Sequence, residues 1–242
     1  MIVTSVQIKT AKTQKHLYCL VFTMNGRHRR MLAVHAFSLV FGEVITMDVP
    51  RHYDLLIDEN NDPFNDPPVL QAYMDRWDGQ PFIDLMALEK DKTVLEIGIG
   101  TGRLARKVAP HCLRLTGIDI SPKTIERAKA NLTAYPNIDL ICADFLRHPF
   151  TQTYDVIYSS LTMMHFADKQ KVIEKVAHLL AGGGRFCLSI DKNRDEYIDM
   201  GTRKLRVYPD TVENITLLAE KAGMRTDTVR EIENAFLISC RR

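Results

Sequence analysis

The stretch Glu96-Ile97-Gly98-Ile99-Gly100-Thr101-Gly102 decides the fold of this 242-residue chain. It begins at the end of a short β-favouring run, residues 93–97, and leads into a helical pattern with apolar residues at 104, 105 and 108. Glycines at such a strand-to-helix turn let the chain reverse sharply and let a ligand approach the backbone without a Cβ in the way. The stretch therefore predicts a nucleotide-sized ligand at the carboxyl end of a strand in an α/β sheet.

The remainder of the chain continues this alternation of strands and helices. Ser121 and Pro122 combine a helix N-cap with a proline at the first helical position, and a later helix is expected to end at the glycines 182–184. The last two strands are separated only by Glu233 and Asn234, so they form an antiparallel hairpin. The predicted strands are 93–97, 113–119, 138–142, 154–159, 185–190, 226–232 and 235–240. This order predicts a doubly wound, mostly parallel sheet with helices on both faces and an antiparallel strand from the hairpin.

Residues 47–90 read as a separate helical segment in front of the main domain, residues 91–242. The segment starts with a loop rich in Asp, Asn and Pro and continues with apolar residues at helical spacing. Gly79 and Pro81 are expected to divide it into two helices.

Residues 1–46 form an atypical N-terminal extension. They carry six Lys or Arg residues and one acid, Glu43, and contain a basic cluster followed by an apolar run at 31–41. Three interpretations are open: a targeting peptide, a structural extension, or residues translated from an over-extended gene in front of a domain that starts at Met47. We favour the third, because residues 42–45 can be encoded by a sequence containing a bacterial ribosome-binding site just before the Met47 codon.

Composition excludes several classes of protein. Outside the extension the chain is mildly acidic, with 26 basic and 29 acidic residues, which makes a nucleic-acid partner unfavourable. The five cysteines form no C-x-x-C pair, so we expect neither a disulfide framework nor a metal site, and a cytoplasmic protein. No apolar run approaches the roughly 20 residues of a membrane span.

The residues around the glycine stretch distinguish between cofactors. A dinucleotide-binding G-x-G-x-x-G pattern fails at Arg103, and a pyrophosphate would be repelled by Glu96. A ligand with an ammonium and a sulfonium, such as S-adenosylmethionine (SAM), would be attracted by Glu96, directly or through water. Asp119 ends the second strand, where an acid can bind ribose hydroxyls, and Asp144 follows the third, where it can accept from an adenine amino group.

The chain resembles the class I SAM-dependent methyltransferase family over roughly residues 50–242. Five segments carry the resemblance in the family's order and spacing, namely 94–102, 117–121, 143–145, 154–160 and 179–185. The resemblance implies a Rossmann-like seven-stranded sheet with an antiparallel last strand. It also implies methyl transfer from SAM, with S-adenosylhomocysteine (SAH) as product, to an acceptor expected to be a small molecule.

The resemblance also implies the site. The glycine stretch would hold the methionine part of SAM, Asp119 the ribose, and Asp144 with Ile120 and Phe145 the adenine. Residues after the fourth strand would border the methyl group, and Tyr53 with the helix of Tyr73 and Trp77 would form a lid. The predicted cofactor-binding residues are Tyr53, Glu96, Gly98, Gly100, Thr101, Gly102, Asp119, Ile120, Asp144, Phe145, Ser159 and Ser160.

His165 is the candidate general base near the active face, although a structural role is more common for a histidine here. Many enzymes of this family act by positioning and need no strong base. A SAM-binding protein without turnover and an NAD(P)-dependent oxidoreductase are the alternative functions. The acceptor atom and the oligomeric state are not determined by the sequence.

Overall fold

A computed structural model describes residues 24–25, 28–29 and 45–242. The chain divides into two units, Met1–Ile45 and Thr46–Arg242. In the first unit, β1 (Met24–Asn25) pairs antiparallel with β2 (His28–Arg29). The hypothesis that residues 1–46 do not belong to the native protein falls almost entirely outside the described residues.

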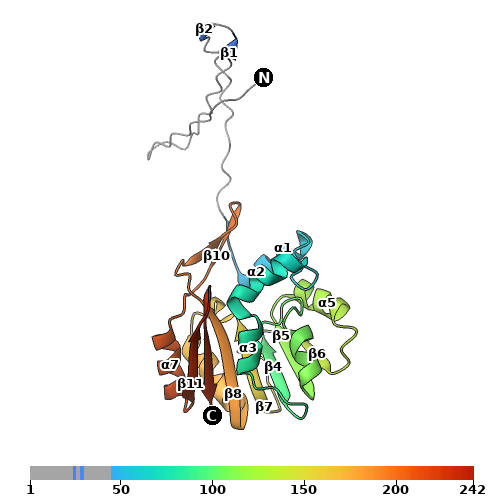
Figure 1. Cartoon of the computed structure of the whole chain (residues 1–242), viewed down its shortest axis with the longest axis vertical. Coiled ribbons are helices and arrows are strands. Elements are labelled where there is room, and N and C mark those ends of the chain that lie inside the picture. The colour runs from blue at the N-terminus through green and yellow to red at the C-terminus, as the bar shows by residue number, and fades with distance from the viewer. Residues whose placement is uncertain (1–23, 26–27, 30–44) are drawn as a thin grey trace. The chain divides into compact units, whose positions relative to one another are not determined.

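The second unit is built on a seven-stranded sheet (Figure 1), as the sequence predicts. Its strands, in spatial order, are β11 (Arg225–Glu231), β12 (Ala235–Arg241), β8 (Leu180–Asp191), β7 (Tyr154–Ser160), β4 (Thr93–Ile97), β5 (Arg114–Asp119) and β6 (Ile138–Cys142). β12 runs antiparallel to both of its neighbours, whereas β8, β7, β4, β5 and β6 pair in parallel. The predicted antiparallel last strand is therefore confirmed.

The central strand β4 marks the point where the strand order reverses. The chain passes outward from β4 to β5 and β6, and then returns to place β7 on the other side of β4. Crossovers on the two sides of such a point diverge, which leaves a crevice at the carboxyl ends of the strands. The glycine turn, which we define as residues 96–102, lies at that end of β4.

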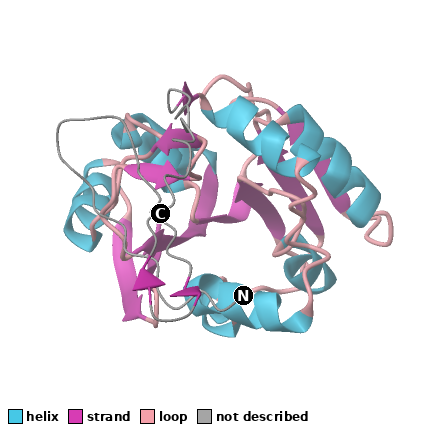
Figure 2. Ribbon diagram, turned by 90° about the horizontal axis from the view of Figure 1, so that it is seen from above, coloured by secondary structure: helices cyan, strands magenta, loops and turns pink. Residues whose placement is uncertain are grey.

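Helices cover both faces of the sheet (Figure 2). α6 and α7 supply one hydrophobic core, and α3, α4 and α5 supply the other. Side chains alternate along β4, so that Leu95 and Ile97 enter the first core and Val94 the second. The helices are α1 (Val49–Asp58), α2 (Pro68–Asp78), α3 (Gln80–Leu85), α4 (Ala105–Val108), α5 (Pro122–Asn131), α6 (Lys169–Leu179) and α7 (Val212–Lys221), with 3-10 turns at Ala109–His111 and Met163–His165.

The predicted breaks in the helical segments occur where the residue types require them. Gly79 separates α2 from α3, and Ser121 caps α5 by accepting a hydrogen bond from the Thr124 backbone N–H at 3.1 Å. Among the described residues, no helix is long and apolar enough to cross a bilayer.

Two local predictions differ from the structure. α6 ends at Leu179, before the glycines 182–184, which lie inside β8 instead of closing the helix. The β7–β8 register shifts between Tyr154 and Val156, opposite this glycine run, and Gly183 has a positive φ of 75°. Glycines in a strand often accompany such irregular pairing. The prediction that these glycines end the preceding helix is therefore wrong.

A small second sheet was not predicted. It has the order β3 (Ile45–Met47), β10 (Arg203–Arg206) and β9 (Tyr197–Asp199), and the β9–β10 hairpin is inserted between β8 and α7. These strands have only three or four residues each, and β10 is mostly charged, so they lack the sustained apolar alternation that identifies strands in a sequence.

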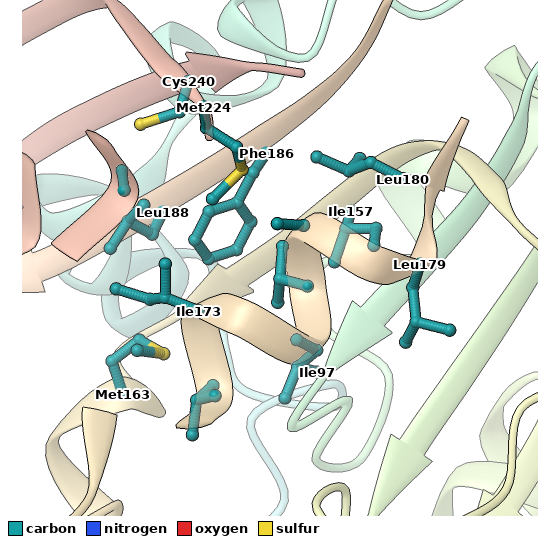
Figure 3. Packing of buried hydrophobic residues seen from close by; sticks show 14 of the residues in the cluster. Ile97, Ile157, Met163, Ile173, Leu179, Leu180, Phe186, Leu188, Met224 and Cys240 are labelled. Atoms are coloured by element: carbon teal, nitrogen blue, oxygen red, sulfur yellow. The ribbon is translucent and has the colours of Figure 1, made fainter. Parts of the chain in front are cut away.

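Phe186 on β8 provides a test of the first core. Figure 3 shows its ring among Leu188, Ile173 and Met224, and its side chain is fully buried. We expect Phe186→Ala to lower the free energy of unfolding by about 3–5 kcal/mol, because it removes a large apolar group and leaves a cavity. Leu217→Ala, at a residue 49% exposed on α7, is the control and should cost under about 1 kcal/mol. Urea denaturation measures both, and equal losses would contradict this packing.

Candidate functional site

A cavity of the second unit lies at the crevice above β4. Its volume is about 410 Å³, and it is walled by the glycine turn, the ends of β5, β6 and β7, and residues of α1 and α2. Of the residues predicted from the sequence to form the site, those lining this cavity are Tyr53, Glu96, Gly98, Gly100, Thr101, Asp119, Ile120, Asp144, Phe145, Ser160 and His165. Gly102 and Ser159 do not line it.

These two exceptions have structural contacts of their own. Gly102 lies against Leu132, so close that a Cβ there would come within 2.8 Å of the leucine Cδ1. Ser159 is fully buried, and its hydroxyl donates to the Ile97 carbonyl at 3.2 Å. Both residues therefore support the walls of the cavity from behind.

The glycine turn is held in a conformation that requires glycine at two cavity positions. Gly98 has φ of 78°, and a Cβ would lie 2.2 Å from the Thr162 hydroxyl, so a larger residue would be strained and would clash. Gly100 has φ of 56°, but a Cβ there would meet no atom within 4 Å. Gly100 therefore presents bare backbone to open space beside the cavity.

Asp119, at the end of β5, connects the glycine turn to the start of α5. Its Oδ2 accepts from the Gly100 N–H and its Oδ1 from the Ser121 N–H, both at 3.0 Å. Burial raises the pKa of this carboxyl, although the backbone donors oppose the shift. Each carboxylate oxygen has a further acceptor position, so the side chain can still bind a ligand hydroxyl.

Glu96 is buried under the glycine turn, with 3% of its surface exposed. The Tyr158 hydroxyl donates to its Oε2 at 2.6 Å. Burial raises its pKa to about 8, against the opposing effects of Tyr158 and Arg103. Glu96 is therefore largely protonated at neutral pH, and a cation nearby would favour its ionised form.

A buried ion pair in the wall was missed by the sequence analysis. Asp78, the last residue of α2, lines the cavity and pairs with Arg103, which follows the glycine turn. The Ser160 hydroxyl donates to the same Asp78 oxygen, Oδ2, at 2.6 Å. Arg103 was considered only as a departure from a dinucleotide pattern, and the sequence contains no local signal that would join it to an aspartate 25 residues earlier.

Tyr53 and His165 both line the cavity and contact each other. The Tyr53 hydroxyl and His165 Nε2 are 2.7 Å apart, and their rings pack edge to face. Burial lowers the pKa of His165 to about 4 and raises that of Tyr53. The pair is therefore uncharged at neutral pH.

The third wall consists of Asp144 and its neighbours. Asp144 Oδ1 accepts from the Leu146 N–H at 2.8 Å, and Arg147 lies 3.6 Å from Oδ2. Phe145 is buried against Phe166, at a ring-centroid distance of 6.4 Å. This wall offers an apolar surface with a carboxylate at its edge.

α1 is fixed over the cavity by polar contacts at several points. Asp54 accepts from the Ser121 hydroxyl at 2.6 Å, and Glu59, just after the helix, makes two bonds of 2.5 and 2.6 Å with Arg203 of β10. From α2, Met74 and Asp78 line the cavity, whereas Tyr73 is 47% exposed and packs on Trp77. Within the part of the chain that the structure describes, no group of three or more His, Cys, Asp or Glu is placed to hold a metal ion.

Comparison with known proteins identifies the family. Residues 94–184 match a family described as methyltransferase domain. Over 152 residues the chain is 31% identical to an uncharacterized methyltransferase of Anoxybacillus flavithermus, and the alignment covers 60% of this chain and 70% of that protein. The chain belongs to the class I SAM-dependent methyltransferase family. The fold and the position of the cavity agree with this membership.

Other methyltransferases are similar over part of their length. Malonyl-[acyl-carrier protein] O-methyltransferase 1 of Ilyobacter polytropus is 30% identical over 148 residues, which cover 60% of this chain and 53% of that protein. The chain spans about half the length of such curated relatives. The crystal structure of the N-methyltransferase NodS from Bradyrhizobium japonicum, a complex with SAH, has a TM-score of 0.63 at 18% identity, covering 80% of this chain and 97% of that one. This structural likeness shows the shared fold.

The titration of His165 tests the burial of this methyltransferase-family site. We expect the imidazole to stay neutral at about pH 5.5 and to protonate near pH 4, because burial disfavours the charged ring. The protein should therefore lose stability as the pH falls from about 6.5 through 4, since the unfolded chain takes up this proton more readily.

Nitrogen-detected NMR of the histidine rings measures this pKa. Tyr53→Phe is the matched control, and its His165 should remain neutral at about pH 5.5 because burial is the main cause of the shift. A wild-type His165 that titrates near its ordinary value of 6.5 would contradict the described environment.

Proposed function

We propose that this chain transfers a methyl group from SAM to a small-molecule acceptor. The observation that carries the proposal is the set of carboxyl groups around the glycine turn, buried Asp78 and Glu96 and partly buried Asp119, beside a cavity at the strand-order reversal. Carboxylates attract a cationic ligand and repel a phosphate. Membership of the methyltransferase family supports the same ligand.

The cavity residues divide into regions that suit the parts of SAM. The backbone at Gly98 and Gly100 would lie along the methionine part, and Asp119 would accept from the ribose hydroxyls. Ile120 and Phe145 would pack on the adenine ring, with Asp144 at its edge. Thr101 lines the same wall, and Gly102 and Ser159 would act through the residues they support.

Bound SAM supplies a methyl group on a sulfonium, which is already activated for displacement. The protein's contribution is then to position the acceptor and to exclude water. Ser160 and Leu161 at the end of β7, with Tyr53 and His165, form the wall where an acceptor would approach. His165 is uncharged and is our candidate proton acceptor, although positioning alone can suffice.

The roles of the two segments, the class of acceptor and the cellular location are also proposals. We propose that residues 47–90 serve as the lid and 91–242 as the cofactor domain, since α1 and α2 both contribute to the cavity wall. A small-molecule acceptor is supported by the apolar lining at Met74, Leu161 and Phe166 and by relatives named for O-methylation. We retain a cytoplasmic location on the basis of the cysteine pattern, and nucleic acid as an acceptor is disfavoured by the mildly acidic body.

The binding experiment is a calorimetric titration of the full chain with SAH. We expect micromolar binding by the wild type and an affinity lower by roughly 10- to 100-fold in Asp119→Asn, because a hydrogen bond to a charged group contributes about 1.5–3 kcal/mol. Asp139→Asn is the control, since Asp139 forms an exposed ion pair with Arg114 outside the cavity. Wild-type protein that fails to bind SAH would refute the proposal.

Turnover separates an enzyme from a SAM-binding protein without activity. The chain is incubated with SAM and a broad panel of small hydroxyl, amine and thiol compounds, and SAH formation is measured. Acceptor-dependent SAH supports methyl transfer, whereas SAM binding without turnover on any acceptor would favour the second function.

The pH dependence of binding reports on Glu96. Because its pKa is about 8 and an ammonium nearby favours ionisation, we expect SAH binding to release a proton at neutral pH. The affinity should therefore rise from about pH 6 to about pH 8 and then level off. Glu96→Gln keeps an acceptor for Tyr158 and should lose this dependence. Calorimetry in buffers of different ionisation enthalpy counts the protons, and an unchanged pH profile in the variant would exclude this role.

A further inference from the structure

Asp78 has one carboxylate oxygen that no protein group satisfies. Its Oδ2 accepts from Arg103 and Ser160, but its Oδ1 is buried and has no hydrogen-bond partner among the described residues. The side chain is 0% exposed and lines the cavity. An unpaired buried acceptor is costly, so a ligand that donates a hydrogen bond to this oxygen would recover free energy on binding.

The surroundings favour a cationic donor. Arg103 neutralises one negative charge, but Asp78 and Asp119 both lie close enough to Glu96 for their charges to raise its pKa. Glu96 already accepts from Tyr158, and Asp119 accepts from two backbone N–H groups. Asp78 Oδ1 is, at the glycine-turn end of the cavity, the oxygen of these three carboxyl groups that is both buried and without a hydrogen-bond partner among the described residues.

The position of Asp78 matches the amino-acid end of the cofactor. Its partner Ser160 ends β7, and its partner Arg103 follows the glycine turn, so Asp78 lies between the two strand ends where the methionine part would bind. Asp78 precedes the family-matched segment 94–184, so the family match assigns it no role.

We infer that Asp78 binds the α-ammonium group of SAM and SAH, and that Arg103 positions Asp78 for this contact. The inference rests on the proposed SAM binding. Asp78, and not Glu96, is then the direct partner of the ammonium group. Glu96 acts on the ammonium only through its charge. The site thereby selects a ligand with an amino-acid end over a plain thioether of adenosine.

Arg103 is suited to the positioning role because it is held from two sides. It contacts Asp78 and also Asp75 at 3.5 Å, and Asp75 is held in turn by Lys107 at 2.8 Å. The side chain of Arg103 is 10% exposed, so its orientation is fixed by burial as well as by charge.

The test compares the affinities of two ligands for the wild type and for matched variants, measured by calorimetry. The ligands are SAH and the SAH analogue in which hydrogen replaces the α-amino group. We expect Asp78→Asn to weaken SAH binding by roughly 10- to 100-fold, because a charge-assisted hydrogen bond is lost. The same variant should change binding of the deaminated analogue by less than about threefold, since that ligand never makes the bond.

Two control variants make the result specific. Asp84→Asn is the same substitution on the adjoining helix α3, but Asp84 is exposed, its side chain bonds only to Gln80 among the described residues and it does not line the cavity, so this variant should bind both ligands as the wild type does. Glu96→Gln should retain the preference for SAH over the deaminated analogue. A preference lost in Glu96→Gln but kept in Asp78→Asn would overturn the inference in favour of Glu96.

A wild-type measurement keeps the inference testable if Asp78→Asn does not fold. In crystals of the wild-type protein with SAH, the amino nitrogen should lie within about 3.2 Å of Asp78 Oδ1. An amino nitrogen outside hydrogen-bonding distance of Asp78, or equal losses for both ligands in Asp78→Asn, would overturn the inference while leaving SAM binding intact. Wild-type protein that binds neither ligand would refute the proposed function itself.

Discussion

The carboxylate of Asp119 links the parts of the structure that form the site. One of its oxygens holds the Gly100 N–H and the other holds the Ser121 N–H, so two loops from adjacent strands share one side chain. Ser121 in turn donates to Asp54 of α1, which extends the connection from the floor of the cavity to the helix over it. The position of the glycine turn, the start of α5 and the lid helix are therefore coupled through three consecutive hydrogen bonds.

This coupling explains how the glycine turn is held in one conformation although glycine itself is conformationally permissive. Gly98 and Gly100 occupy positive φ values, and the Gly98 N–H also donates to the Ile118 carbonyl at 2.9 Å. Because neighbouring groups fix these backbone dihedrals, the turn need not be ordered by a ligand at the time of binding. Preorganisation of this kind reduces the free-energy cost of association.

Most of the fold was predictable because its signals are local. The strand at 93–97, the Ser121 cap of α5 and the closely spaced terminal strands each follow from residue type and spacing, and together they predict the strand order. The glycines 182–184 show the limit of local reasoning, since the same residues that end a helix also fit an irregular strand. The β9–β10 hairpin lacks an apolar pattern and is defined by its contacts with the rest of the unit.

The site was predictable to the extent that its residues lie next to the strands that carry them. Glu96 and Asp119 lie at the carboxyl ends of β4 and β5, and Asp144 lies just after β6, so the parallel sheet brings all three to one edge. Asp78 and its ion pair with Arg103 depend on the packing of α2 against the sheet, which no spacing in the sequence specifies. The pairing of Tyr53 with His165, 112 residues apart, is non-local in the same way.

The distribution of charge along the cavity follows from these two non-local pairs. At the glycine-turn end, Asp78 and Glu96 are buried where a bound cation can compensate the cost of their desolvation. At the lid end, burial keeps Tyr53 and His165 neutral, so neither of these two side chains presents a positive charge to a ligand. A sulfonium between the two ends would meet attraction on one side and no repulsion on the other. Transfer of its methyl group removes that positive charge, so a proton released by the acceptor could enter His165 without raising the net charge of the cavity.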